Sequence, residues 1–234
     1  KKKGKFILHN YFPPPQKPFT LNLATLDKDL SKICYNHVKN TIRHSGEMES
    51  SIYSFHAGFL IDPKPNKLGK KFIKQKMYNK KIAIDVFIER INDLSIFAKK
   101  EGVSLLIENN VINKQNLNLF KTNPLLMTDN EDAQYIMKNT PKNVNLLVDV
   151  AHLKVSAKTL KFNPRQFLTN CDQWIKGYHL SDNNGDSDTN EPVTKNSWFW
   201  PYLKKNLTYY TLEVNLKTTE MLKKQKNLTL EMLS

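Results

Sequence analysis

The sequence NVNLLVDVAHLKVSA, residues 143–157, decides the fold class that we predict. Four of the five residues 144–148 are apolar, and they do not alternate regularly with polar residues. Such a run is typical of a strand that is buried on both faces, as in a parallel sheet covered by helices. The run nevertheless ends in the charged Asp149, and His152 follows three positions later. This combination suggests a chemical role for the end of the strand.

Further segments of the same kind occur along the chain, and helical patterns separate them. The strands that we predict are residues 5–9, 51–56, 103–108, 144–149, 175–180 and 208–213. Apolar residues recur at helical spacing across 30–42 and 84–98, and Gly102 stands where the second of these helices would end. We expect shorter helices at 130–139, 164–172 and 218–226. Strands that alternate with helices are typical of parallel βαβ units, so we predict an α/β fold.

Length and composition favour one globular domain over residues 1–234. Hydrophobic residues make up 39% of the chain and charged residues 25%, which excludes a disordered or collagen-like protein. No apolar run approaches the ~18 residues of a membrane span, and the lysine-rich start lacks the apolar stretch of a signal peptide. Cys34 and Cys171 form no metal-binding pair and fit a reducing compartment, so we expect a cytoplasmic protein with no membrane partner.

The chain is strongly basic, with a net charge of +14 and a pI near 9.6. A basic surface is one way to bind nucleic acid. However, only three of the 36 basic residues are arginines, the residue that proteins favour for contacts with phosphates and bases. We therefore favour a solvated lysine-rich surface over a DNA-binding groove.

Each predicted strand ends in, or one residue before, a side chain that can bind a metal or transfer a proton. These side chains are His9, His56, Glu108, Asp149, His179 and Glu213. In a parallel α/β barrel the carboxyl ends of the strands converge on one face, where active sites lie. We therefore expect all of them to surround one site.

The carboxylates among these residues would repel one another unless a cation lies between them. We therefore predict a site for one divalent metal ion, with the ligands Glu108, Asp149, His179 and Glu213. This oxygen-rich set suits Mn²⁺, Co²⁺ or Mg²⁺, and Zn²⁺ is also compatible with it.

Considered singly, most of these residues have simpler interpretations. His9 and His56 are compatible with histidines in the core or in a turn. Asp149 could cap the next helix, and Glu213 could lie in a first helical turn. Only the joint pattern at the strand ends favours a functional site.

Two long loops, residues 109–130 and 181–203, follow predicted strands and are candidate lids. The second loop contains Asp182, Asp186 and Asp188, which are ordinary turn residues in such a context. It also contains Trp198, Phe199 and Trp200, an aromatic cluster that more often packs than binds a ligand.

The sequence resembles the xylose-isomerase-like TIM barrels, a superfamily of sugar isomerases and epimerases that also holds endonuclease IV. The motifs that carry the resemblance are LLIEN, LLVDVAHL, GYHLSDNNGDSD and LEVN, in the family's order and spacing, with FHAG and NLAT matching as well. The resemblance covers nearly the whole chain and implies a TIM (β/α)8-type barrel. Because only six strands are visible, we expect the first two βα units of the barrel to be absent and the chain to be N-terminally incomplete.

The resemblance also implies roles for single residues. The metal ligands predicted above match those shared by the sugar epimerases of the family, and His152 matches a histidine that contacts the substrate. In the nuclease branch His9 and His56 correspond to ligands of a second metal. That branch also has an Asp-x-His pair where this chain has Asp188 and Asn190. An asparagine amide does not readily replace an imidazole as a tight ligand, which argues against a three-metal phosphodiesterase site.

We predict a divalent-metal-dependent isomerase or epimerase of a sugar or sugar phosphate. Glu108 and Glu213 would be the catalytic pair, one removing a proton beside a carbonyl that the metal polarises and the other returning it. The residues that we expect to contact substrate are His9, His56, His152, Asp182, Asp188, Asn190, Trp198 and Trp200. One alternative is an endonuclease-IV-like phosphodiesterase acting on abasic DNA, and another is a barrel that only binds a ligand. A homo-oligomer is compatible with each of these functions.

Overall fold

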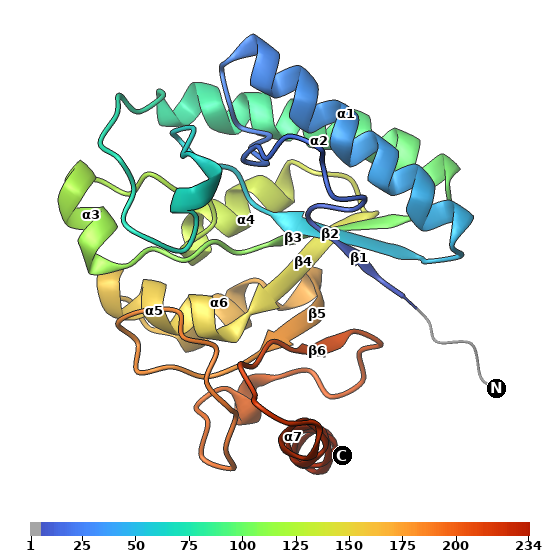
Figure 1. Ribbon diagram of the computed structural model, residues 1–234, viewed down its shortest axis with the longest axis vertical. Helices are drawn as coiled ribbons and strands as arrows, with labels where there is room; N and C mark the ends of the chain where they lie inside the picture. The colour runs from blue at the N-terminus through green and yellow to red at the C-terminus, as the bar shows by residue number, and fades with distance from the viewer. Residues whose placement is uncertain (1–5) are drawn as a thin grey trace.

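Within residues 6–234, six parallel strands form one sheet in the order β1-β2-β3-β4-β5-β6, so each strand pairs with its neighbours in the sequence. The structure is a computed structural model and describes residues 6–234. The strands are β1 (Leu8–His9), β2 (Ile52–His56), β3 (Ser104–Glu108), β4 (Val144–Asp149), β5 (Ile175–Leu180) and β6 (Tyr210–Leu212). Figure 1 shows the strongly twisted sheet, which forms half of a barrel. The predicted α/β fold with six visible barrel strands is confirmed.

The two edge strands are shorter than the sequence pattern predicts. The inner strands β2 to β5 begin and end within one residue of the predicted bounds, whereas β1 has two residues and β6 has three. Each edge strand pairs with a single neighbour, so fewer ladder hydrogen bonds hold its backbone extended. Lys5, the predicted start of β1, lies outside the described residues, and Glu213 directly follows β6.

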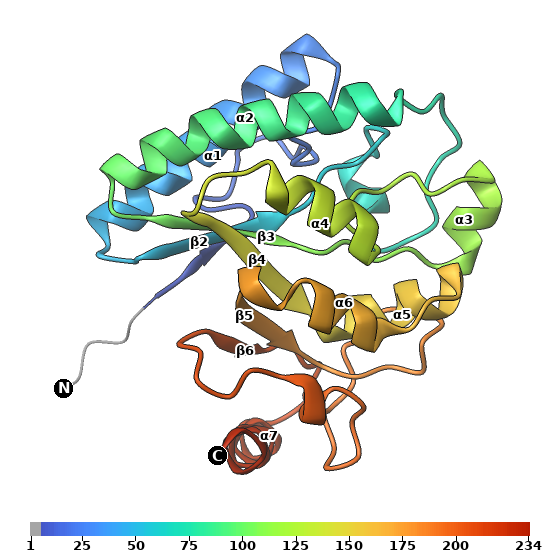
Figure 2. The same cartoon turned by 180° about the vertical axis from the view of Figure 1, so that it is seen from behind.

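Helices cover the outer face of the half-barrel. The helices of residues 6–234 are α1 (Lys28–Glu47), α2 (Lys80–Lys100), α3 (Lys114–Phe120), α4 (Asn130–Lys138), α5 (Val150–Leu160), α6 (Pro164–Asn170) and α7 (Thr219–Leu233), with short 3-10 turns at Pro65–Lys67, Asp172–Trp174 and Trp200–Tyr202. Figures 1 and 2 show α1, α2, α4, α5 and α6 on one side of the sheet and α7 near its β6 edge. Helix α3 lies in a segment predicted as loop, and the Asn113 side chain caps it.

Alternate residues of each strand face either the helices or the interior of the half-barrel. On β2, Tyr53 and Phe55 are fully buried in the main core between sheet and helices. A separate apolar cluster on the interior face consists of Leu106, Leu147 and Tyr209. Glu108 and Asp149 each lie two residues beyond a member of this cluster on the same strand. Their side chains therefore project from the interior face at the carboxyl edge of the sheet.

The NLAT and FHAG motifs pack against each other beside the end of β2. The Asn22 side chain donates to the carbonyls of Phe59 and Ile61 at 3.1 Å each and accepts from the Phe59 N–H at 2.9 Å. A Cβ atom at Gly58 would lie 2.4 Å from the Ala24 Cβ. Glycine is therefore needed at position 58 for the two segments to approach this closely.

None of the helices within residues 6–234 combines the length and the apolar content of a membrane span. Cys34 and Cys171 are free and buried, each packed in the main core. The cytoplasmic location and the N-terminally incomplete single domain stay predictions.

Candidate metal centre

The carboxyl ends of four consecutive strands bring together the residues predicted to bind a metal. Glu108 and Asp149 end β3 and β4, His179 is the next-to-last residue of β5, and Glu213 follows β6. Each residue offers one ligand atom, and these atoms all lie within 4.8 Å of one another. Parallel pairing in register, with Asp149 opposite His179, thus converts the pattern of strand ends into a compact cluster.

The cluster contains buried polar atoms without partners. Within the part of the chain that the structure describes, no hydrogen bond of good geometry reaches Glu108 Oε2, Asp149 Oδ2, His179 Nδ1 or Glu213 Oε2. Buried polar atoms are nearly always paired, and these atoms have at most ion contacts within the described site, so a shared cation would satisfy several of them at once. Carboxylate oxygens and an imidazole nitrogen are ordinary ligands of divalent cations. The side chains present therefore fit such an ion.

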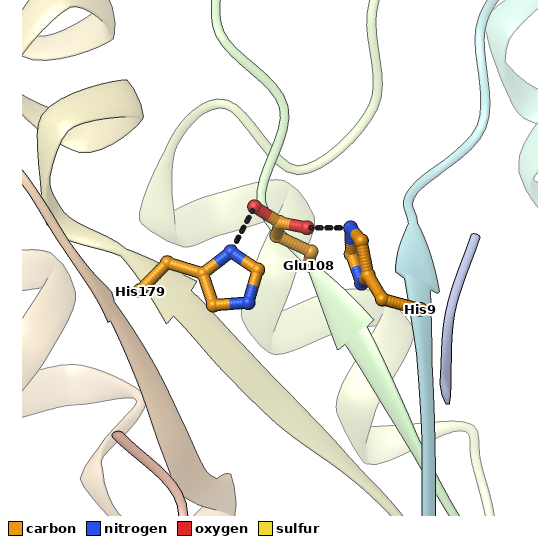
Figure 3. A group of neighbouring side chains, drawn as sticks. All are labelled: His9, Glu108 and His179. Carbon is orange, nitrogen blue, oxygen red and sulfur yellow. Dashed lines mark ion pairs between the residues drawn. The ribbon is translucent and has the colours of Figure 1, made fainter. Parts of the chain in front are cut away.

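Glu108 lies at the centre of the cluster and is only 1% exposed. Its Oε1 lies 3.2 Å from His179 Nδ1 and 3.6 Å from His152 Nδ1, and its Oε2 lies 3.3 Å from His9 Nε2 and 3.6 Å from His56 Nδ1. Figure 3 shows the carboxylate between the imidazoles of His9 and His179. Burial alone would raise its pKa, but His56 and His179 outweigh burial and hold the Glu108 pKa well below its usual range.

Asp149 has two separate functions in this arrangement. Its Oδ1 accepts a hydrogen bond from the His152 N–H at 2.7 Å and caps α5, whereas its Oδ2 is the orphaned atom. The Asn109 side chain accepts from the Asp149 N–H at 2.8 Å and donates to the Asp149 carbonyl at 3.1 Å. Burial raises the pKa of Asp149 to about 7. The helix-cap interpretation is therefore compatible with a ligand role, because each uses a different oxygen.

His179 and Glu213 form the closest charged contact of the cluster, with Nδ1 2.8 Å from Oε2. Burial disfavours the imidazolium, but Glu108 and Glu213 raise the pKa of His179 to about 12. The contact with His179 in turn lowers the pKa of Glu213. The neighbouring carboxylates therefore favour the protonated form of the His179 imidazole.

A cavity of about 280 Å³ opens beside the cluster. Four predicted site residues line it, namely His56, His152, Asp188 and Glu213. His152 Nε2 lies 3.1 Å from Asp188 Oδ2, so these two side chains form a joined polar surface. The rest of the wall includes the apolar side chains Leu21, Phe59, Leu68, Phe72 and Leu125. Ligand pockets have volumes of about 300–1,000 Å³, so this cavity lies at the lower limit and has room only for a small molecule.

The predicted site residues His9, Glu108, Asp149 and His179 do not line the cavity. Glu108 instead contacts His9 and His179. His9 reaches the cluster from the edge strand β1, and burial lowers its pKa to about 4.

The predicted substrate contacts in the loop 181–203 divide into two groups. Asp188 reaches the cavity, whereas Asp182, Asn190, Trp198 and Trp200 are not on its wall. Asp182 accepts from Lys154 Nζ at 2.6 Å and from Ser197 Oγ at 2.7 Å, so it holds the loop against α5. The Asn190 carbonyl accepts from the Asn215 N–H at 2.8 Å. These contacts fix the loop locally, and the substrate contacts of Asp182 and Asn190 stay predictions.

The tryptophans of this loop pack into the protein interior. Trp200 is 4% exposed and donates its indole N–H to the Thr194 carbonyl at 2.7 Å. Its ring lies 4.6 Å from that of Phe199, and Trp198 packs against the same main core. The packing interpretation therefore fits both tryptophans, and their contact with substrate stays a prediction.

Sequence reasoning missed three polar residues that support the cluster. Ser54 precedes His56 by two positions, Tyr209 precedes Glu213 by four, and Asn109 directly follows Glu108. The strand period of two would have placed Ser54 and Tyr209 on the same face as the strand-end residues. No comparable periodicity identifies Asn109, whose contacts depend on the pairing of β3 with β4.

Comparison with known proteins identifies the family. A family model described as xylose isomerase-like TIM barrel matches residues 3–213. The chain belongs to this family. No curated protein matches the sequence.

Solved structures of xylose isomerase-like TIM barrels and sugar epimerases share the fold. The chain is similar to a D-tagatose 3-epimerase-like protein, with a TM-score of 0.70 and 18% identity over 97% of this chain and 76% of that one. It is similar to a protein from Thermus thermophilus soaked with ZnCl2, with a TM-score of 0.63 and 18% identity over 98% of this chain and 79% of that one. D-Psicose 3-epimerase from Clostridium cellulolyticum, solved with D-tagatose, has a TM-score of 0.59 and 12% identity over 91% of this chain and 70% of that one.

Proposed function

We propose that this protein is a divalent-metal-dependent isomerase or epimerase of a sugar or a related hydroxy-carbonyl compound. The observation that carries the proposal is the cluster of Glu108, Asp149, His179 and Glu213, whose orphaned atoms lie together beside a small cavity. Structural similarity to proteins named as sugar epimerases supports the same reaction class. A zinc-soaked and a magnesium-bound structure among the similar proteins support a metal cofactor.

The reaction that we propose moves a proton next to the substrate carbonyl. A bound divalent cation would supply a Lewis acid that polarises the carbonyl and an adjacent hydroxyl. Glu108 and Glu213 lie at the ends of different strands, and contacts with neighbouring histidines lower the pKa of each carboxyl, which favours the carboxylate form that accepts a proton. One of them removes the proton from the carbon, and the other, after taking up a proton from solvent, donates that proton to the opposite face of the same carbon.

The cavity wall contains the groups that would orient the substrate. His56 and His152 line it beside Glu213, and the imidazole of His152 is held by Asp188 at 3.1 Å and by the Asn109 carbonyl at 3.0 Å. Hydroxyl groups of a sugar can bond to these side chains. The apolar side chains of the same cavity limit the entry of water and can contact the carbon atoms of the substrate.

The test follows the exchange of substrate hydrogen with solvent deuterium, using a panel of sugars and sugar phosphates with Mn²⁺, Co²⁺ or Mg²⁺. Replacing a proton-transfer carboxylate with an amide removes the base, so Glu108→Gln and Glu213→Gln should each lower the exchange rate by about 10²–10⁴-fold. Glu220→Gln, at an exposed position in the first turn of α7, is the matched control and should exchange like the wild type. Wild-type rates in either active-site variant contradict the assignment.

A second candidate function is cleavage of abasic DNA, and two observations favour it. Two further groups of three residues bring potential ligand atoms within 4.8 Å of one another, namely His9 with Glu108 and His179, and His56 with Glu108 and His152. Glu108 is therefore shared by several possible metal sites. Six lysines lie within residues 64–76, a segment whose Lys70 lines the cavity. A basic rim of this kind would attract a phosphate backbone.

Metal content distinguishes the two candidates. One ion per chain, measured by elemental analysis after dialysis, supports the isomerase, and two or three ions support the phosphodiesterase. Incision of an abasic duplex that weakens steeply with salt would favour the second function. Hydrogen exchange on a sugar without DNA incision would exclude it.

A further inference from the structure

A chain of hydrogen-bonded side chains runs beneath the candidate metal centre from His179 to His9. His179 Nε2 lies 3.1 Å from the Tyr209 hydroxyl, which lies 3.3 Å from Ser54 Oγ. Ser54 Oγ lies 2.9 Å from His9 Nδ1. Each imidazole therefore uses one nitrogen in this chain and directs the other toward Glu108.

The Tyr209 ring occupies a space that Gly177 on the neighbouring strand β5 leaves open. The Tyr209 side chain packs with Leu106 and Leu147 on the interior face, and the residue is 5% exposed. A Cβ atom at Gly177 would lie 2.6 Å from Tyr209 Cδ1 and 3.0 Å from Cγ. Gly177 precedes His179 by two residues on β5, so the missing side chain leaves room for the phenol ring directly beside the imidazole.

We propose that Tyr209 is a positioning residue that fixes the imidazole of His179 so that Nδ1 faces the carboxylates of the candidate metal centre. A metal-binding imidazole must keep its proton on the other nitrogen, and a hydrogen-bond partner for that N–H selects the orientation. The Tyr209 hydroxyl is the side-chain partner of Nε2 in the described structure, and Ser54 holds the hydroxyl from its other side. This inference rests on the metal dependence in the proposed function.

The obvious test is Tyr209→Phe, which removes the hydroxyl and keeps the ring. Tyr210→Phe is a matched control, because the Tyr210 hydroxyl bonds only to the backbone of Lys204 and Leu207 in the described structure. Calorimetric titration of chelator-treated protein with Mn²⁺ and with Co²⁺ gives the affinity. Loss of an outer partner of a ligating histidine typically costs 10–100-fold in metal affinity, and we expect that loss for Tyr209→Phe alone.

Gly177→Ala provides an independent second variant. It keeps the hydroxyl but crowds the Tyr209 ring, so it should weaken Mn²⁺ binding in the same direction. The Co²⁺-loaded proteins supply a readout that a general loss of stability would not change. The visible absorption spectrum of Co²⁺ depends on its ligand arrangement, so it should change in Tyr209→Phe and not in Tyr210→Phe.

The possible outcomes separate this inference from the proposed function. Tight Mn²⁺ binding in the wild type with equal binding in Tyr209→Phe overturns the positioning role alone. Equal weakening in Tyr209→Phe and Tyr210→Phe also overturns it, because the effect is then not specific to His179. Weakened binding in Tyr209→Phe alone supports the role, even if no sugar undergoes exchange and the isomerase proposal fails. A wild-type protein that binds neither ion overturns both.

Discussion

Cys34 and Cys171 show how burial controls the chemistry of a single side chain. Both residues are 0% exposed. Burial raises the pKa of the Cys34 thiol to about 11 and that of the Cys171 thiol to about 12. Because the thiolate is the reactive form, raising the pKa lowers reactivity at mildly alkaline pH. We expect neither cysteine to react with iodoacetamide in the native protein and both to react in urea, as measured by mass spectrometry. Rapid alkylation of either native thiol contradicts this expectation.

At the same scale, the residues that sequence could predict are those whose chemistry coincides with a strand end. Glu108, Asp149 and His179 could be predicted because a charged or imidazole group after an apolar run is unusual in a buried strand. Tyr209 could not be predicted, because a tyrosine in a β-rich segment is ordinary and its role depends on a contact with His179 across strands. For Trp198 and Trp200 the aromatic composition of the segment favours packing over a ligand site, and both side chains pack in or against the main core.

Among the elements, the loop after β2 depends on one glycine. The 2.4 Å between a Cβ at Gly58 and the Ala24 Cβ is far inside van der Waals contact, and the Ala24 backbone nitrogen would be 3.2 Å away. We therefore expect Gly58→Ala to lower the free energy of unfolding by about 1–3 kcal/mol through overpacking. Urea denaturation followed by circular dichroism measures the change.

A compensating variant makes the Gly58 prediction specific. Ala24→Gly removes the methyl group that a Cβ at position 58 would meet. Combining it with Gly58→Ala should recover part of the lost stability, since one clash is relieved while the backbone contact remains. Losses that simply add in the double variant contradict the proposed contact.

The elements that sequence predicted best are those with several neighbours. Strands β2 to β5 pair on both sides, and their apolar runs coincide with their bounds. Strands β1 and β6 pair on one side, so their length depends on tertiary contacts that the pattern does not contain. Helix α3 has seven residues and an asparagine-rich sequence, which gives it a weak helical signal.

For the molecule as a whole, the candidate metal centre joins the strands that form most of the sheet. Its predicted ligands come from the ends of β3, β4 and β5 and from the residue after β6. Without a cation, the buried carboxylates of Glu108 and Asp149 lie in the same cluster, and burial raises the pKa of Asp149 to about 7. A divalent ion between these two carboxylates would relieve the repulsion of their negative charges. It would also bind the folded chain far better than the unfolded one, because only the folded chain brings the ligands together.

Metal binding should therefore raise the thermal stability of the whole chain. At a free Mn²⁺ concentration about 100-fold above the dissociation constant, linkage gives about 2.7 kcal/mol of added stability. For a chain of this size that corresponds to a rise in Tm of roughly 5–11 °C, measured by calorimetry after chelator treatment and again after adding Mn²⁺. Glu213→Gln, which removes one ligand, should show a much smaller rise at the same Mn²⁺ concentration. Glu220→Gln should keep the full rise, because an exposed carboxylate on α7 has no part in the cluster. An equal rise in wild type and Glu213→Gln would place the stabilising ion elsewhere on the protein.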